Sequence, residues 1–158
     1  MPTMGALHQG HLSLIKRARK ENNLVVLSIF VNPAQFGPTE DLKNYPRDYN
    51  KDKSFAQKEK VDIIFYPSDK IMYPTGFLTY ITVNKIGDVL CGKSRPGHFR
   101  GVATVVSKLL NIVDPDNLYL GQKDGQQVVI LRTMIKDLNI PVKVNVCPTL
   151  REKDGLAM

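Results

Sequence analysis

The sequence has no tryptophan, two cysteines and no long run of apolar residues. Cys91 and Cys147 lie far apart, so their spacing predicts neither a disulfide framework nor a cysteine-based metal site. A membrane-spanning helix needs about 20 apolar residues, and the longest apolar run, Leu24 to Val31, has the length of a buried strand. The first residues also lack the basic and apolar regions of a signal peptide. We therefore expect a cytoplasmic protein with no membrane segment.

The composition predicts one folded, basic domain. The chain has 158 residues, of which 42% are hydrophobic, and this fraction excludes a disordered protein. The 22 lysines and arginines exceed the 15 acidic residues by seven, which favours anionic ligands without choosing among them. The basic residues are scattered along predicted helices, and no recognised nucleic-acid-binding module accompanies them. We expect no nucleic-acid partner.

Predicted strands and helices alternate along the chain. Apolar periodicity, together with Gly, Pro and Asn boundaries, predicts the following elements: a helix from about 11 to 22, a strand over Leu24–Phe30, a helix over 48–60, strands over Val61–Tyr66 and Leu78–Val83, a helix over 102–113, a strand over Leu118–Leu120, a helix from Asp124 to about Leu138, and a strand over Val142–Val146. This alternation predicts an α/β protein whose parallel sheet is flanked by helices.

The first candidate site is the segment Gly5-Ala6-Leu7-His8-Gln9-Gly10-His11. His8 and His11 are three residues apart at the start of a helix, so they share a face. A helix N-terminus attracts anions, and imidazole N–H groups can stabilise developing negative charge. The alternative is a glycine-rich turn with surface histidines. A zinc site is disfavoured because no third ligand has a suitable spacing.

Two further polar segments each follow a predicted strand. Asn32 and Gln35 come after the first strand, and Lys123, Asp124 and Gln127 come after the strand over 118–120. Amides can donate to and accept from a hydroxy acid, and Lys123 offers a point charge to phosphate. Loop capping also explains the segment with Asn32 and Gln35 when it is taken alone. Because parallel strands end at one sheet edge, we expect all three segments to form one nucleotide-sized cleft.

A fourth segment, from Arg95 to Gly101, is either an anion site or a surface turn. Arg95 and His98 supply its polar groups. The helix that follows carries Val105 and Val106 at positions typical of core packing, and one of its turns can also wall an apolar pocket.

Together, the following segments resemble the pantoate–β-alanine ligase family: PTMGALHQGH, FVNPAQF, YPRD, RPGHFRGVATVV, GQKDGQQ and PTLREKDGLAM. The resemblance covers nearly the whole chain. It implies a Rossmann-like domain of the HIGH-type nucleotidyltransferase superfamily. It also implies that ATP and pantoate form pantoyl adenylate and pyrophosphate with the help of Mg²⁺. The amine of β-alanine then displaces AMP to give pantothenate, a precursor of coenzyme A. The family further implies a homodimer.

The resemblance also implies roles for individual residues. His11 would be the catalytic proton donor, and His8 would help to hold the phosphates. The ATP-binding residues would be Met4, Gly5, Ala6, Leu7, His8, Gln9, Gly10, His11, Gly121, Gln122, Lys123, Asp124, Leu150 and Met158. Gln35 and Gln127 would bind pantoate and β-alanine, with Asn32, Val105 and Val106 as further pocket residues. Mg²⁺ would arrive with ATP and have no direct protein ligand, although Asp52 would lie near the metal and phosphates.

The chain also departs from the family pattern. Residues 1–158 correspond to the N-terminal nucleotide- and pantoate-binding domain. Compared with the family, we expect the chain to lack an upstream helix, most of the first strand, a Ser-Ser-Arg phosphate loop and a C-terminal domain. We therefore expect weak or no ligase activity and reduced stability. Gly125 replaces a larger residue at a helix start, at a cost of about 1 kcal/mol relative to alanine. The alternatives are a nucleotidyltransferase with another acceptor, a remnant that keeps only the nucleotide cleft, and a basic nucleic-acid-binding protein.

Overall fold

The computed structural model describes residues 1–38 and 40–158. Its elements, in chain order, are β1 (Pro2–Thr3), α1 (Gln9–Glu21), β2 (Val26–Ile29), the 3-10 turn η1 (Pro33–Gln35), α2 (Tyr49–Lys58), β3 (Ile63–Phe65), α3 (Asp69–Met72), α4 (Cys91–Ser94), α5 (His98–Val113), β4 (Asn117–Gly121), the 3-10 turn η2 (Gln122–Asp124), α6 (Gly125–Asp137) and β5 (Lys143–Cys147).

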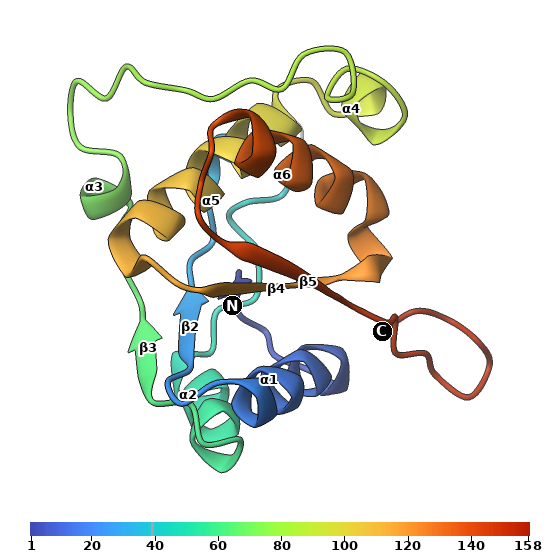
Figure 1. Ribbon diagram of the computed structural model, residues 1–158. Coiled ribbons are helices and arrows are strands. Elements are labelled where there is room, and N and C mark those ends of the chain that lie inside the picture. Colours follow the sequence, from blue (N-terminus) through green and yellow to red (C-terminus); the bar gives the residue numbers. More distant parts are fainter. Residues whose placement is uncertain (39) are drawn as a thin grey trace.

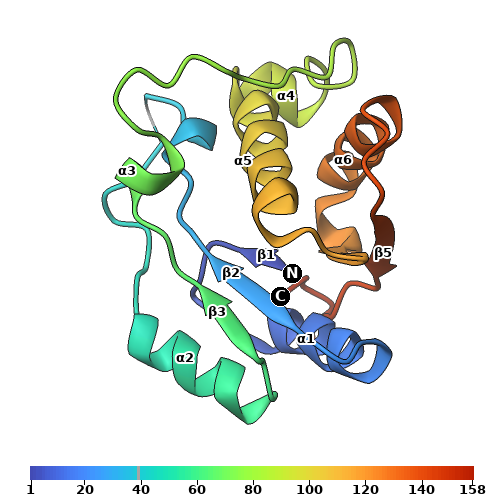
Figure 2. The same cartoon turned by 60° about the vertical axis from the view of Figure 1, so that its left-hand side comes forward.

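The strands pair in parallel, as predicted, but they form two hydrogen-bonded groups. One sheet has the order β1-β2-β3, and the other pairs β4 with β5. Helices α5 and α6 lie on one side of the strands, and α1 and α2 lie on the other (Figures 1 and 2). The α/β prediction with flanking helices is therefore confirmed, although the single expected sheet is divided. None of the helices in the described ranges is long and apolar enough to cross a bilayer.

Apolar side chains fill a core on each side of the strands. The larger core is built around α5, whose valines and leucines pack against Phe30, Leu118 and Leu131. The smaller core lies between α1 and β2, where Ile15 and Leu27 are fully buried. The helical spacing of apolar residues in α1 and α5 places these side chains on one face of each helix. These cores hold the carboxyl ends of the strands in place.

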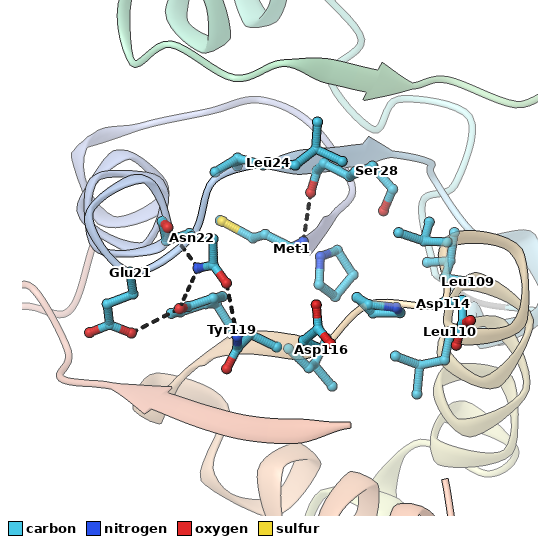
Figure 3. Close-up of a pocket in the computed structure, with 18 of the residues that line it drawn as sticks. Met1, Glu21, Asn22, Leu24, Ser28, Leu109, Leu110, Asp114, Asp116 and Tyr119 are labelled. Atoms are coloured by element: carbon cyan, nitrogen blue, oxygen red, sulfur yellow. Dashed lines mark hydrogen bonds between the residues drawn. The ribbon is translucent and has the colours of Figure 1, made fainter. Parts of the chain in front are cut away.

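A slot of about 730 Å³ separates the two sheets (Figure 3). It is lined by β2, by β4 and by the last turns of α5. The amino group of Met1 lies in the slot and donates to the carbonyl oxygen of Val26 at 2.8 Å. The buried hydroxyl of Ser28 has no hydrogen-bond partner among the described residues. Of the predicted site residues, Val106 alone lines this slot.

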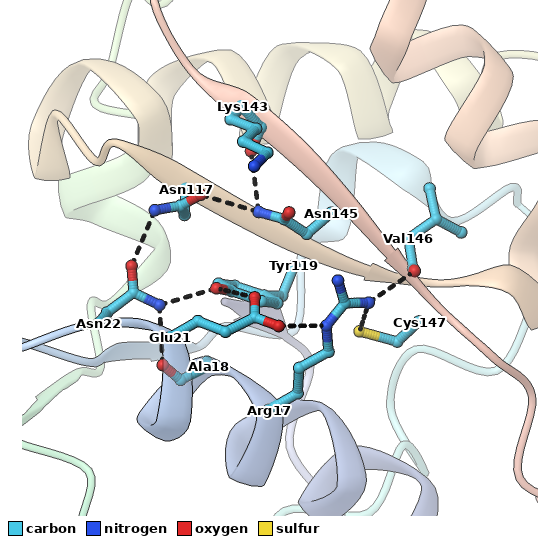
Figure 4. A network of polar contacts seen from close by, with 10 residues as sticks. All are labelled: Arg17, Ala18, Glu21, Asn22, Asn117, Tyr119, Lys143, Asn145, Val146 and Cys147. Carbon is cyan, nitrogen blue, oxygen red and sulfur yellow. Dashed lines mark hydrogen bonds and ion pairs between the residues drawn. The ribbon is translucent and has the colours of Figure 1, made fainter.

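A polar network joins α1 to β4 and β5 (Figure 4). The Tyr119 hydroxyl donates to Glu21 at 2.8 Å and accepts from the Asn22 amide at 2.7 Å. Asn117 donates to Asn22 at 2.8 Å, and Asn145 donates to Asn117 at 2.9 Å. Asn22 is also the C-cap of α1, which ends where the sequence predicts. The network connects the β4-β5 sheet to the helix that begins at the two histidines.

The strand predicted over Leu78–Val83 is wrong. This segment has no strand partner among the described residues, and its alternating side chains serve a different purpose. Ile81 and Val83 pack against the larger core, while Leu78 is 88% exposed. The backbone N–H of Ile81 donates to the Thr104 hydroxyl at 3.0 Å instead of to a strand. The apolar and polar side chains alternate here because the segment is extended and packs one of its faces against α5, and not because it is a strand of a sheet.

Candidate functional site

The loop that follows β1 is held by a buried carboxylate. Asp52 of α2 is only 2% exposed. Its oxygens accept from the backbone N–H groups of Ala6 at 3.0 Å and Leu7 at 2.8 Å. Gly5 adopts φ +85°, and a Cβ atom there would lie 2.7 Å from Asp52. The glycine is therefore required both by the backbone conformation and by the close approach of Asp52.

His8 and His11 cap the first turn of α1 with their side chains. Gly10 N–H donates to His8 Nδ1 at 3.2 Å, and His8 N–H donates to His11 Nδ1 at 3.4 Å. The two rings lie 4.1 Å apart. Because each Nδ1 accepts a hydrogen bond, each neutral ring carries its proton on Nε2. The capping arrangement thus leaves both histidines with an Nε2–H donor that is not used by the cap.

The surroundings keep both imidazoles neutral. Burial lowers the pKa of His11 to about 4, with further lowering contributions from the neighbouring His8 and Lys123. The pKa of His8 is also lowered, first by burial and then by Lys123, with Glu152 acting in the opposite direction. At neutral pH the two rings are therefore hydrogen-bond donors without a positive charge.

Two amide side chains lie beyond the carboxyl end of β2. Asn32 is 1% exposed and Gln35 is also buried. The Asn32 amide donates to Gln35 Oε1 at 3.0 Å and to the carbonyl of Gly101 at 3.1 Å. The Gln35 amide donates to the sulfur of Met4 at 3.3 Å. Gln35 thereby connects η1 to the loop that precedes the histidines.

Helix α5 packs tightly against η1 and supports the amides from behind. A Cβ atom at Gly101 would lie 2.2 Å from the Ala34 carbonyl oxygen, so only glycine permits this approach. His98 Nδ1 lies 2.9 Å from the carbonyl oxygen of Gln35. Arg95 contacts His98 and forms an ion pair with Glu40, which lowers the pKa of the Glu40 carboxyl to about 2. The Arg95–His98 segment therefore braces η1, and neither residue lines the cavity described below.

The carboxyl end of β4 supplies the remaining polar groups. Gly121 ends the strand, η2 carries Lys123 and Asp124, and Gln127 lies in the first turn of α6. Asp124 is the N-cap residue of α6, as predicted, but within the described ranges its carboxylate makes no capping hydrogen bond. The carboxylate is therefore available to a ligand.

One cavity of about 370 Å³ brings these groups together. The predicted residues that line it are Met4, His8, Gly10, His11, Asn32, Gln35, Val105, Val106, Gly121, Lys123, Asp124, Gln127, Leu150 and Met158. The expected convergence of the histidines with Lys123 and Gln127 is thus confirmed. The three strand-to-helix junctions meet in one place, although their strands belong to two sheets.

Six predicted residues, including Asp52, lie outside this cavity. The backbone N–H groups of Ala6 and Leu7 are already bound to Asp52, and the Leu7 side chain is buried in the smaller core. Gly5 lies beside Asp52, and Gln9 is exposed on α1. Gln122 lines a separate surface depression next to Arg17 and Arg132.

The cavity also has walls that the motifs did not indicate. Tyr45 and Thr149 line it, together with the apolar side chains of Phe30 and Leu120. Tyr45 comes from the loop before α2, where its partial burial raises the pKa of its hydroxyl. Leu120 belongs to the strand predicted over Leu118–Leu120, but no local pattern distinguishes a strand residue that packs in the core from one that faces a cavity.

The site is built for an anion next to a small polar molecule. Imidazole N–H donors, the Lys123 ammonium, the amides and the apolar face of α5 all line the cavity. Within the described residues no group of three or more His, Cys, Asp or Glu side chains could hold a metal ion. Asp52, the predicted neighbour of the metal, uses its oxygens on the loop instead.

Comparison with known sequences gives one consistent family. A family model described as pantoate-beta-alanine ligase matches residues 1–158. Proteins named pantothenate synthetase from Caldicellulosiruptor saccharolyticus and Sulfurihydrogenibium sp. are 59% and 61% identical to the chain over 158 residues. The match covers all of this chain and 56% of each relative. The chain therefore spans about half the length of the curated relatives it matches.

Solved structures agree with the sequence comparison. A pantothenate synthetase from Thermus thermophilus matches 99% of this chain and 57% of its own, with 51% identity and a TM-score of 0.98. A pantoate-beta-alanine ligase from Francisella tularensis, described as complexed with beta-gamma ATP and beta-alanine, matches 99% of this chain and 60% of its own, with 51% identity and a TM-score of 0.96. The chain shares the α/β, HIGH-type nucleotidyltransferase fold of these neighbours.

Proposed function

Because the chain belongs to the pantoate-beta-alanine ligase family, we propose that it forms the ATP- and pantoate-binding site of an enzyme that joins pantoate to β-alanine. The observation that carries this proposal is the single cavity lined by His8, His11, Lys123, Gln35 and Gln127. These residues combine donors for a polyphosphate with amides for a hydroxy acid.

The reaction has two steps. A carboxylate oxygen of pantoate attacks the α-phosphorus of ATP, and the bond from that phosphorus to the β-phosphate oxygen breaks. Pyrophosphate leaves with the bonding electrons, and pantoyl adenylate remains. The amine of β-alanine then attacks the acyl carbon, the bond to AMP breaks, and the nitrogen loses a proton. The products are pantothenate and AMP. The chain contributes positioning and electrostatic stabilisation.

The phosphates would lie against the histidines. The Nε2–H groups of His8 and His11 and the Lys123 ammonium supply donors where negative charge grows on the departing pyrophosphate. His11 was expected to be a proton donor. Its pKa of about 4 favours donation of a hydrogen bond from a neutral ring. A bound triphosphate would raise the pKa of His11, because nearby negative charge stabilises the imidazolium.

The nucleoside would lie near the end of β4. The free carboxylate of Asp124 can accept hydrogen bonds from ribose hydroxyls, and Gly121 permits close approach of the backbone. Leu150 and Met158 line the same cavity and offer apolar contacts to the adenine. Met158 N–H donates to the Leu150 carbonyl oxygen at 3.0 Å, which holds these two residues together.

Pantoate and β-alanine would lie between the amides and α5. Gln35 and Gln127 would bind the hydroxyl and carboxylate groups, and Asn32 would orient Gln35. Val105 and Val106 provide the apolar wall that methyl groups of pantoate need. This arrangement would place the pantoate carboxylate next to the phosphates.

Mg²⁺ enters this proposal with the nucleotide. Asp52 is buried and already accepts two backbone hydrogen bonds, so its donor set does not fit a direct metal ligand. Phosphate oxygens are the ligands that Mg²⁺ prefers in such sites, with water completing its shell. The ion would neutralise phosphate charge when it is bound, while the protein groups orient the phosphates.

The same proposal covers the organisation of the protein. Residues 1–158 would act as the nucleotide- and pantoate-binding domain of a cytoplasmic ligase that works as a homodimer. No nucleic acid would bind, because the donors that line the cavity suit a small triphosphate rather than an extended backbone.

Exchange of labelled pyrophosphate into ATP tests the proposal. The native protein with Mg²⁺ is expected to exchange label only when pantoate is present, because the first step is reversible and pantoate is the acceptor. Calorimetric titration should show binding of both ATP and pantoate. Exchange without pantoate would instead support a nucleotidyltransferase with another acceptor.

Two further outcomes contradict the proposal. If the protein bound ATP and did not bind pantoate, the result would support the alternative in which only the nucleotide cleft is retained. Binding of duplex or single-stranded nucleic acid at about 50 mM salt, weakening steeply as salt rises, would favour the nucleic-acid hypothesis.

A further inference from the structure

A chain of hydrogen bonds runs from outside the cavity to one of its amides. The Tyr73 hydroxyl donates to Asn32 Oδ1 at 2.7 Å, and Asn32 Nδ2 donates to Gln35 Oε1 at 3.0 Å. Tyr73 is the C-cap residue of α3 and does not line the cavity. Asn32 and Gln35 do line it. The order Tyr73–Asn32–Gln35 therefore links a remote hydroxyl to the substrate pocket.

Two backbone groups fix the orientation of the Asn32 amide. The Ala34 N–H can only donate, and its nitrogen lies 3.3 Å from Asn32 Oδ1. The Gly101 carbonyl can only accept, and its oxygen lies 3.1 Å from Asn32 Nδ2. A flipped Asn32 would place its NH₂ group against the Ala34 N–H and its oxygen against the Gly101 carbonyl. Because Asn32 is 1% exposed, water cannot relieve these contacts.

The orientation of Asn32 determines the orientation of Gln35. Since Asn32 Nδ2 is a donor, the atom of Gln35 that faces it must be the oxygen. The Gln35 NH₂ group then points the other way, and its contact among the described residues is the Met4 sulfur at 3.3 Å. A thioether sulfur is a weak acceptor, so a ligand oxygen can replace it at little cost.

We propose that Tyr73 is a positioning residue: it holds in place the Asn32 amide, whose orientation the two backbone groups determine, and Asn32 thereby presents the Gln35 amide as a hydrogen-bond donor toward a carboxylate or hydroxyl oxygen of the acid substrate. The identity of that acid as pantoate rests on the proposed function. The polarity of Gln35 rests on the hydrogen bonds alone. A substrate that presents an ammonium group to Gln35 would meet N–H donors and bind poorly.

The surroundings of Tyr73 suit this role. Its ring packs edge-on against Phe77, with centroids 5.1 Å apart, and lies 6.3 Å from the ring of Phe30. Burial raises the pKa of the Tyr73 hydroxyl to about 12, so the hydroxyl keeps its proton and remains a donor. The ring contacts hold Tyr73 in place independently of the hydroxyl, which allows the two contributions to be separated.

The Tyr73→Phe substitution removes the hydroxyl and keeps the ring. In the native protein we expect the KM for pantoate to rise about three- to tenfold, the effect of losing one neutral hydrogen bond. We expect the affinity for ATP to be unchanged. Tyr80→Phe is the matched control, because Tyr80 belongs to the same row of aromatic rings and its hydroxyl makes no hydrogen bond among the described residues. This control should leave the KM for pantoate and the affinity for ATP unchanged.

A ligand-free measurement tests directly whether Tyr73 holds Asn32 in place. Hydrogen exchange of the Asn32 side-chain NH₂ protons, followed by NMR, should be faster in Tyr73→Phe than in the wild type and unchanged in Tyr80→Phe. Unchanged pantoate KM in Tyr73→Phe, or equal losses for ATP and pantoate, would overturn the positioning role. If wild-type protein fails to bind pantoate, the proposed function fails, and the exchange measurement then decides the inference by itself.

Discussion

The Asp52 carboxylate accepts the backbone N–H of Leu7 at 2.8 Å across 45 residues of sequence. A second oxygen accepts from Ala6 at 3.0 Å, and both contacts lie beneath the loop that leads to the histidines. A carboxylate accepts such bonds more strongly than a neutral group does. The loop conformation therefore depends on α2, an element that carries no described residue lining the cavity.

Asp52→Asn should destabilise the protein and weaken ATP binding. An asparagine side chain has one acceptor oxygen and would turn an NH₂ group toward a backbone donor. We expect a loss of about 1.5–3 kcal/mol in the free energy of unfolding, typical of hydrogen bonds to a charged group. Urea unfolding and ATP titration measure the two effects. Asp48→Asn, at the exposed N-cap of the same helix, is the control and should leave ATP affinity unchanged.

Gly101→Ala should disturb the pantoate site from behind. The added Cβ would lie 2.2 Å from the Ala34 carbonyl oxygen, so α5 and η1 would have to move apart. We expect destabilisation of about 1–3 kcal/mol, as for other overpacked sites. Because η1 carries Gln35, pantoate affinity should fall more than ATP affinity. Equal stability of the variant and the wild type would contradict the close approach.

Gly125→Ala should have the opposite effect on stability. Gly125 adopts ordinary helical dihedrals, with φ −53° and ψ −43°, and a Cβ there meets no atom within 4 Å. Alanine lowers the entropy of the unfolded chain without strain, so we expect a gain of about 0.4–1 kcal/mol. Thermal unfolding measures both variants, and we expect the stability to rise in Gly125→Ala and to fall in Gly101→Ala. A loss of stability at Gly125 would argue against open space there.

Protonation of His11 should make stability depend on pH. Its pKa is about 4 in the folded protein, against about 6.5 in an unfolded chain. Between these values the unfolded chain binds a proton that the folded protein does not, so the free energy of unfolding falls as pH decreases from about 6.5 to about 4. His11→Gln, which keeps a side chain suited to the capping box, should show a shallower slope. If His11→Gln left the pH dependence of the free energy of unfolding unchanged, His11 would not be the group that causes it.

Lys123→Met should weaken phosphate binding and raise the pKa values of both histidines. Burial and Lys123 lower the pKa of His8, and burial, His8 and Lys123 lower that of His11, so removal of the ammonium relieves part of each shift. We expect ATP affinity to fall about 10- to 100-fold, the range for a lost charged hydrogen bond. NMR titration measures the pKa values of the His8 and His11 imidazoles. Lys136→Met, on the exposed face of α6, is the control and should change neither quantity.

Much of the secondary structure and most of the polar groups of the cavity could be predicted from local patterns. The 3.6-residue apolar period predicted α5 from Val102 to Val113, although the helix begins four residues earlier at His98, and β2 lies within a continuous apolar run. The residues after β2 and β4 were recognisable because parallel strands bring their carboxyl ends together. The predicted element over Leu78–Val83 failed because a strand requires a partner, and alternation alone does not provide one.

The order of side chains along the chain by itself determined the α/β class, the presence of a helix next to His8 and His11, and the polar residues at the strand ends, because each depends on neighbours close in sequence. Tertiary structure alone decided that the strands form two sheets, that Asp52 supports the histidine loop and that Tyr73 orients Gln35 through Asn32. Those outcomes depend on contacts between residues far apart in sequence, such as Asp52 with Leu7 and Tyr73 with Asn32, and such hydrogen bonds form only when packing brings the partners within about 3 Å.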